Sequence, residues 1–341
     1  MTDLVALYFV ASPLQYLAAK RIAEAHEAGA RNVLVWYKPG VTPIVRAADW
    51  DASAYMPWPR WEPLPGRFGR LRRQRANLRE VAALVGPCTR LHIHSAVFDT
   101  EAINYFLRAL PRACGAQTMH ARILPDGIIS IRRYPLSPLK AAAQYLRKLR
   151  RLVAPELDYW CFSGDRIGSD APFCDRIYVL PGLPHEYPAA KVVTLPPLVD
   201  LAADERTPVP PRALVIGQPL AGAGLMSAAD SEATGRRIRA WLAEKGITEI
   251  YYKGHPKDSA RELNHPDYRA LELDQPLESH LADTPYRCIV GTRSSALLFA
   301  AQLGRPDTQV AAFGLDQVKF KNPTEQQQML ALFDHLGVAR L

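Results

Sequence analysis

Short apolar segments alternate with amphipathic segments along almost the whole first half of the chain. Runs rich in β-branched and aromatic residues are typical of strands, and apolar residues spaced three and four apart are typical of helices. The predicted strands are 4–10, 32–37, 90–94, 119–124, 159–162, 177–180 and 191–195. The predicted helices are 13–28 and 101–110. Strands separated by helices indicate parallel βαβ units.

A second alternating set follows a proline-rich segment at 196–211, which we interpret as a linker. Its predicted strands are 213–216, 247–252, 288–290 and 309–313, and its predicted helices are 232–244, 296–303 and 324–336. The expected fold is α/β, with two Rossmann-like domains facing each other across a cleft. The expected divisions are a first domain at 1–195, the linker at 196–211, a second domain at 212–323, and a final segment at 324–341 that packs back on the first domain.

Composition narrows the class of protein. The 341 residues suffice for two domains, and the net charge of +8 favours an anionic partner. The five cysteines are scattered without a C-x-x-C pair, which argues against a disulfide framework or a zinc ribbon and favours the cytoplasm. Leu4–Val10 is short and follows Asp3, so we interpret it as a strand rather than a signal peptide, and no apolar run reaches the roughly 20 residues of a membrane span.

Polar and basic residues follow three predicted strands of the second half. The three segments are Gly217-Gln218-Pro219, Lys253-Gly254-His255-Pro256 and Thr292-Arg293-Ser294-Ser295. Carboxyl ends of parallel strands meet at one sheet edge, where helix N-termini bind anions, so these segments predict a phosphate site. His255 can donate to a departing phosphate near neutral pH, although a His-Pro pair is often only a turn, as at His265-Pro266. Likewise, the two serines can simply cap the following helix.

Two segments of the first half end at the corresponding edge. Asp126-Gly127 follows the strand 119–124, where it is either a turn or the site of a general base that takes a proton from an acceptor hydroxyl. Ser12 to Gln15 begin a helix after the first strand, with Ser12 as the expected N-cap at the edge of the cleft.

One further loop has two possible interpretations, and two motifs that resemble metal sites are set aside. The loop 220–224 lacks a nucleotide fingerprint, so it either brings backbone close to a nucleotide or forms a plain turn. His92 and His94 share a strand face, and Asp49-Trp50-Asp51 resembles a metal-nucleotide motif. Neither comes with a complete ligand pattern, so no metal is expected.

Two basic segments remain. Arg67–Arg79 is either a solvated helical face or a surface for anionic lipid or acidic glycan. Lys140–Arg151 interleaves apolar and basic residues, which fits contact with an anionic membrane surface. Nucleic acid is not expected as a partner.

Taken in order, these motifs resemble those of bacterial sialyltransferases, in particular glycosyltransferase family 52 and the polysialyltransferase-like group. The resemblance implies a GT-B fold, a CMP-activated nine-carbon acidic sugar as donor, inversion at the anomeric carbon, and neither metal nor cofactor. It implies that Asp126 is the general base and that His255 assists CMP departure. It also implies donor contacts from Gly127, Gly217, Gln218, Pro219, Lys253, Gly254, Pro256, Thr292, Arg293, Ser294 and Ser295, with Ser12 and Gln15 on the acceptor side. The family usually has an acidic residue before the Asp-Gly pair, where this chain has Pro125.

The resulting hypothesis is an inverting sialyltransferase that acts on a bacterial surface glycan or glycolipid, in lipooligosaccharide or capsule biosynthesis. It is expected to work in the cytoplasm, at the inner face of the membrane. One alternative is a GT-B enzyme for another activated sugar, such as CMP-Kdo or a UDP-sugar, including epimerisation of a sugar nucleotide. The other is a non-catalytic two-domain protein that binds anionic glycan or nucleic acid through its basic segments.

Overall fold

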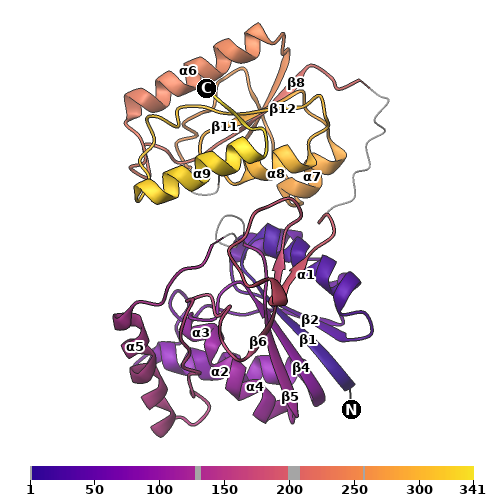
Figure 1. Ribbon diagram of the computed structural model, residues 1–341, viewed down its shortest axis with the longest axis vertical. Helices are drawn as coiled ribbons and strands as arrows, with labels where there is room; N and C mark the ends of the chain where they lie inside the picture. The colour runs from indigo at the N-terminus through magenta and orange to yellow at the C-terminus, as the bar shows by residue number, and fades with distance from the viewer. Residues whose placement is uncertain (1, 127–131, 199–207, 256–257) are drawn as a thin grey trace. The chain divides into compact units, whose positions relative to one another are not determined.

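Two separate parallel sheets, each accompanied by helices, make up the chain (Figure 1). The computed structural model describes residues 2–126, 132–198, 208–255 and 258–341. It divides into two units, Met1–Leu198 and Val199–Leu341, which are described one at a time below. The division between Leu198 and Val199 lies inside the predicted linker, and the α/β fold class is confirmed.

The N-terminal unit contains a seven-stranded parallel sheet of order β3-β2-β1-β4-β5-β6-β7. The strands are β1 Thr2–Val10, β2 Arg31–Trp36, β3 Ala52–Tyr55, β4 Cys88–Ser95, β5 Thr118–Ile123, β6 Cys174–Val179 and β7 Val192–Thr194. The α-helices are α1 Pro13–His26, α2 Gly69–Val85, α3 Glu101–Asn104, α4 Phe106–Cys114 and α5 Pro138–Lys148. Short 3₁₀ helices are η1 Pro39–Ile44, η2 Ala47–Asp49, η4 Leu149–Leu152 and η5 Ala189–Lys191.

The alternation of side chains along β1 supplies both faces of this sheet. Leu7 and Phe9 join the large apolar cluster that includes Leu78 of α2 and Phe106 of α4. Tyr8 points to the other face, where its ring stacks on His94 with the ring centroids 4.4 Å apart. Successive residues of a strand face opposite sides of the sheet, so β1 packs against side chains on both faces. For this reason β1 is buried from Val5 to Val10.

A buried cluster of ionisable side chains lies on the Tyr8 face. Glu27 is 2% exposed, and its carboxylate lies 3.0 Å from Nδ1 of His92 and 3.3 Å from Nε2 of His94. Arg122 bridges Glu27 and Asp175, with its Nη2 2.9 Å from Oδ2 of Asp175. Burial favours a higher pKa for Glu27, but the two histidine contacts and the Arg122 charge together hold that pKa well below its usual value. Within the described ranges no group of three or more His, Cys, Asp or Glu side chains could hold a metal ion.

The C-terminal unit contains a six-stranded parallel sheet of order β10-β9-β8-β11-β12-β13. The strands are β8 Arg212–Ile216, β9 Glu249–Lys253, β10 Arg269–Ala270, β11 Cys288–Gly291, β12 Gln309–Ala312 and β13 Ala339–Arg340. The helices are α6 Ala228–Glu244, α7 Leu277–Asp283, α8 Ala296–Leu303 and α9 Pro323–His335. Its core gathers Val215, Ile238, Leu242, Val290 and Phe313. The final helix α9 contacts β13 of this same unit, and the bracing of the first domain stays a prediction.

The predicted strand at 159–162 is wrong. This apolar segment is buried at Tyr159, but the backbone N–H of Trp160 donates to the side-chain oxygen of Asn104 at 2.7 Å. The N–H of Phe162 donates to the side-chain oxygen of Gln144 at 2.9 Å. Two buried amide side chains therefore supply acceptors that a strand would take from its neighbour.

The buried histidine predicts an acid-sensitive fold. Burial lowers the pKa of His94, against the opposing effect of Glu27. The unfolded chain therefore takes up a proton below about pH 6.5 that the folded chain resists, and the free energy of unfolding falls as the pH drops below that value. Unfolding in urea, followed from about pH 7.5 to about pH 5.5, should show a smaller loss of stability for His94→Phe than for wild type, since one pKa unit corresponds to about 1.4 kcal/mol.

The control is His120→Phe, at an exposed position on neighbouring β5, which should keep the wild-type pH profile. An identical pH profile for wild type and His94→Phe would contradict this prediction.

Candidate functional site

The three polar segments of the C-terminal unit lie at one edge of its sheet. Strands β9, β8 and β11 are adjacent and parallel, with Val215 paired to Tyr252 on one side and to Val290 on the other. The segments 217–219 and 292–295 follow the carboxyl ends of β8 and β11, and Lys253 ends β9 with Gly254 and His255 after it. Pro256 lies outside the described residues, as does Gly127. This edge is where open parallel sheets bind ligands.

Gly217 is fixed by close packing against the neighbouring strand. Its N–H donates to the carbonyl of Lys253 at 2.9 Å, and a Cβ at this position would collide with the ring of Tyr252. The hydroxyl of Tyr252 in turn donates to Oδ2 of buried Asp258 at 2.9 Å. Burial, this hydrogen bond and the Asp258 charge raise the pKa of Tyr252, which keeps the phenol neutral. The turn after β8 is thus held by a ring and a carboxylate from the β9 side.

Gln218 and Arg293 connect the turn after β8 to the turn after β11. The side-chain oxygen of Gln218 accepts from the backbone N–H of Arg293 at 2.9 Å. The guanidinium of Arg293 donates to the carbonyl of Lys319 at 2.9 Å, contacts Glu325 and lies over the ring of Phe320. The Arg293 side chain is therefore engaged by the segment 319–325, and its predicted donor contact stays a prediction.

The serine segment directly precedes α8 and contacts its first turn. Oγ of Ser294 accepts from the N–H of Ala296 at 3.3 Å, at the start of α8. Ser294 and Ser295 are both half-buried, whereas Thr292 is fully buried. No hydrogen-bond partner for Oγ1 of Thr292 is found in the part of the chain that the structure describes. Ser294 thus binds the first N–H of α8, while the N-cap residue Ser295 makes no side-chain capping bond, and the helix N-terminus lies at the edge where an anion is expected.

A pocket of about 410 Å³ opens at the end of β9. Lys253, Gly254 and His255 line it on one side, and Nζ of Lys253 donates to the carbonyl of Gly254 at 3.3 Å. Its other lining residues are Tyr252, Asp258, Ser259, Arg261, Ala270 and Glu272. The volume is within the range of small-molecule sites. Because β9 and β11 are two strands apart, their ends lie roughly 10 Å from one another across the sheet.

The loop 220–224 is a closed turn. Glu262 accepts hydrogen bonds from the N–H groups of Ala221 and Gly222 at 2.6 and 2.8 Å, and from the hydroxyl of Ser231 at 3.0 Å. Burial favours a higher pKa for Glu262, but these hydrogen bonds lower it overall, so the carboxylate stays ionised. Of the two interpretations of this loop, the structure favours the turn, because these two donors are already bound. No sequence signal links Glu262 to a loop 40 residues earlier.

The predicted residues of the N-terminal unit follow β1 and β5. Oγ of Ser12 accepts from the N–H of Gln15 at 3.2 Å, which confirms Ser12 as the N-cap of α1. The buried Gln15 side chain accepts from the N–H of Ala11 at 2.7 Å, so it holds the same turn. Asp126 is half-buried beyond β5, and desolvation of the half-buried Tyr37 together with the negative charge of Asp126 raises the pKa of that phenol.

A pocket of about 450 Å³ in the N-terminal unit was not predicted from the sequence. It lies beyond the carboxyl ends of β3 and β4, where Trp58, Asp99 and Thr100 line it. Arg166 donates to Asp99 within the pocket at 2.9 Å. The other lining residues are Pro59, Arg60, Arg70, Leu71, Gln74, Glu101, Ala102, Leu136, Lys140, Gln144 and Arg147. Neither Ser12 nor Gln15 is among them.

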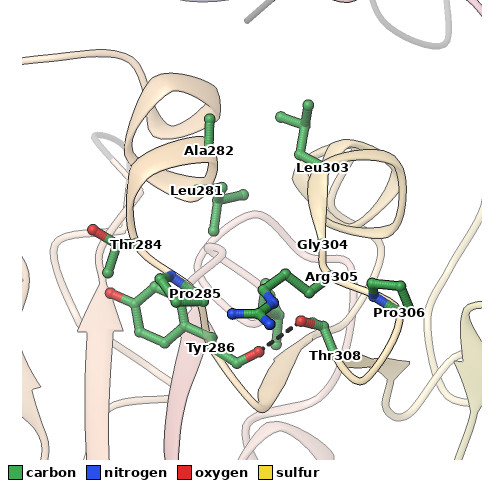
Figure 2. Close-up of a pocket in the computed structure, with 11 residues that line it drawn as sticks. Leu281, Ala282, Thr284, Pro285, Tyr286, Leu303, Gly304, Arg305, Pro306 and Thr308 are labelled. Carbon is green, nitrogen blue, oxygen red and sulfur yellow. Dashed lines mark hydrogen bonds between the residues drawn. The ribbon is translucent and has the colours of Figure 1, made fainter. Parts of the chain in front are cut away.

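A smaller pocket of the C-terminal unit lies at the opposite edge of its sheet. Figure 2 shows Arg305 between the ends of α7 and α8, with Thr308 donating to the carbonyl of Tyr286 at 2.8 Å. Tyr286 and Thr308 precede β11 and β12, so this pocket lies at the amino ends of the strands. Its volume of about 120 Å³ is below the range of nucleotide-sized ligands. It is therefore no candidate for the donor site.

Two parallel α/β units in one chain define a protein with the GT-B type of fold. The solved glycotransferase of kitacinnamycin is similar over 98% of this chain and 85% of its own, at 12% identity and a TM-score of 0.51. CalG4, the calicheamicin glycosyltransferase, gives 14% identity, 100% and 86% coverage and a TM-score of 0.48. UDP-N-acetylglucosamine 2-epimerase from Rickettsia bellii gives 11% identity, 99% and 89% coverage and a TM-score of 0.46. At these sequence identities the similarity concerns the fold alone. Of the three TM-scores, only that of the kitacinnamycin glycotransferase is high enough to support a shared fold.

The family comparison is more specific. Residues 197–311 match the model of the alpha-2,8-polysialyltransferase (POLYST) family, and this stretch includes all three segments at the sheet edge of the C-terminal unit. The predicted resemblance to sialyltransferases is confirmed for this stretch of the chain, and the match supports a glycosyltransferase enzyme. Among curated proteins, none matches the sequence. In the described ranges, no helix combines the length and apolar character needed to cross a membrane.

The packing at Gly217 predicts a specific intolerance to a methyl group. Gly217→Ala forces the Tyr252 ring to move, and we expect a loss of about 1–3 kcal/mol in the free energy of unfolding, as for other overpacked sites. Gly235→Ala is the matched control, because Gly235 lies within α6 and a Cβ there meets no atom within 4 Å. That control should gain about 0.5–1 kcal/mol. Equal stability of the two variants in urea unfolding would count against the packing role of Gly217.

Proposed function

We propose that this chain transfers sialic acid, or a related nonulosonic acid, from its CMP-activated donor to a hydroxyl group of a bacterial surface glycan. The observation that carries the proposal is the match of 197–311 to the polysialyltransferase family, which covers most of the unit whose sheet edge holds Lys253, His255 and Ser294. Transfer occurs with inversion, in the cytoplasm at the inner face of the membrane. The donor is a substrate, and neither a metal nor a cofactor takes part.

The reaction breaks one bond and forms another at the anomeric carbon of the donor. The acceptor oxygen attacks that carbon while the bond to the CMP phosphate breaks and its electron pair leaves with the phosphate oxygen. The carboxylate of Asp126 takes the proton of the acceptor hydroxyl, and His255 donates to the departing phosphate. Inversion follows because attack and departure take place on opposite faces of the sugar ring.

Fixed donors at the edge of the C-terminal sheet support the role of this unit in leaving-group stabilisation. Lys253 and His255 line one pocket, and α8 begins with its N-terminus at the same edge. Donors that are already in position stabilise developing negative charge without reorganising at the moment of reaction. CMP carries a single phosphate, which leaves less charge to neutralise than a diphosphate does. Pro125 stands where related enzymes have an acidic residue, so Asp126 acts without that neighbour.

Nucleotide selectivity tests the donor class. We expect CMP and the CMP-sugar to raise the melting temperature of the chain, and UDP and GDP to leave it unchanged. A ligand at about 100 times its Kd adds about 2.7 kcal/mol of stability, which for a protein of this size is a shift of a few degrees. Stabilisation by UDP instead would replace the donor class with UDP-sugars, for transfer or epimerisation. An unchanged melting temperature with every one of these nucleotides would favour a non-catalytic binder of anionic glycan.

Substitution of the two proposed catalytic residues tests the mechanism. Asp126→Asn should lower kcat by about 10²–10⁴, the range for loss of a general base, and His255→Ala should lower it by a comparable factor. The control is His265→Ala, which removes the histidine of the other His-Pro pair and should leave turnover near that of wild type. Turnover is measured as CMP release in the presence of acceptor. Turnover near that of wild type in Asp126→Asn or His255→Ala would remove that residue from the mechanism.

A further inference from the structure

The helix α5 and its continuation η4 expose their apolar side. Nine large hydrophobic side chains are exposed in the described part of the chain, and six of them belong to this one stretch, 139–153. They are Leu139 at 84%, Tyr145 at 66%, Leu146 at 69%, Leu149 at 56%, Leu152 at 77% and Val153 at 92%. In Figure 1, α5 lies at the periphery of the N-terminal unit. A contiguous apolar patch of this kind usually marks an interaction surface.

Polar side chains anchor the opposite side of this stretch. Gln144 is 2% exposed and accepts from the N–H of Phe162. Arg147 donates to the carbonyl of Asp99 at 3.3 Å, and Arg150 donates to the hydroxyl of Tyr105 at 3.1 Å. The usual arrangement of a surface helix is therefore reversed, since polar groups attach it to the protein and leucines face outward.

A second segment with exposed apolar side chains lies across the larger pocket of the N-terminal unit from α5. Trp61 is 57% exposed and Phe68 is 75% exposed, just before α2. The pocket of about 450 Å³ is lined by Arg70 of α2 and by Lys140, Gln144 and Arg147 of α5, so the two segments flank the same pocket. We call the exposed side chains of 61–70 and 139–153 the apolar-basic face. It holds eight of the nine exposed large hydrophobic side chains.

Cations accompany the apolar side chains of this face. Arg67, Arg70 and Lys140 are exposed, and Lys148 is half-exposed. In the ranges that the structure describes, none of these four forms an ion pair within the chain. Exposed leucines flanked by unneutralised cations are complementary to a surface that is apolar beneath a negatively charged layer.

We propose that the apolar-basic face docks the N-terminal unit onto an anionic lipid bilayer. Leucines of α5 and η4 enter the boundary between headgroups and acyl chains, and the lysines and arginines contact lipid phosphates. A helix attached through Gln144, Arg147 and Arg150 presents its leucines in the plane of such a surface without unfolding. The unpaired cations of this face, together with the outward-facing leucines of α5, favour an anionic bilayer over a second copy of this chain. This inference does not depend on the proposed function, because it concerns binding of lipid alone.

Sedimentation with lipid vesicles tests the proposal on the full chain. Wild type should bind vesicles of phosphatidylcholine with phosphatidylglycerol much more tightly than vesicles of phosphatidylcholine alone. The double variant Leu146→Asp, Leu149→Asp should weaken that binding at least tenfold. The double variant Lys140→Gln, Lys148→Gln should weaken it on the order of tenfold, and only on the anionic vesicles, since each cation near a charged membrane contributes separately.

Matched variants outside the face serve as controls. Leu341→Asp changes the one exposed large hydrophobic residue outside the face among the residues that the structure describes, and Arg236→Gln removes an exposed cation of α6. Both variants should bind vesicles as wild type does. Urea unfolding of each variant verifies that the fold is retained.

Three results would overturn the proposal. The first is equal binding of wild type to the two kinds of vesicle, and the second is undiminished binding by the Asp double variant. The third is a wild type that does not bind vesicles but forms a dimer in sedimentation velocity, with the Asp double variant monomeric. The last result would assign the face to a second copy of the chain.

Discussion

The parallel register of β9, β8 and β11 is the constraint on which the candidate donor site depends. Three chain segments separated by up to 75 residues end at one sheet edge because these strands are neighbours that run in the same direction. The hydrogen bond from Arg293 to Gln218 and the packing of Gly217 on Tyr252 then fix the turns relative to one another. Polar segments that look unremarkable one by one become a candidate site for an anion because the sheet aligns them.

Buried polar side chains have a comparable organising role in the N-terminal unit. Glu27, His92, His94 and Arg122 form a buried cluster of ionisable side chains on one face of the sheet. Asn104 and Gln144 bind the backbone of the segment that was expected to be a strand. Such groups are costly to bury unless each is paired, so a network of this kind specifies one arrangement of the elements around it. The same Gln144 anchors α5 from inside, which leaves the leucines of that helix outward.

The sequence predicted the elements whose patterns are strong and local. The runs 4–10 and 213–216 are strands and are apolar over their whole length, as expected of strands buried on both faces. The short strand Ala52–Tyr55 was missed because its half-buried alanines and serine carry no such pattern. The segment 159–162 was mistaken for a strand because burial, which the apolar run did indicate, does not by itself provide a neighbouring strand.

By itself, the sequence determined the class of fold, the order of the motifs and the strands that they follow, because these properties lie in short runs of residues. Only the tertiary structure decided which strands are neighbours, that Glu262 closes the loop 220–224, and that the Arg293 side chain engages 319–325. It also decided which side of 140–151 faces outward. Such facts depend on contacts between residues far apart in the chain, and no local pattern of apolar and polar positions encodes the partner of a buried charge or of a helix face.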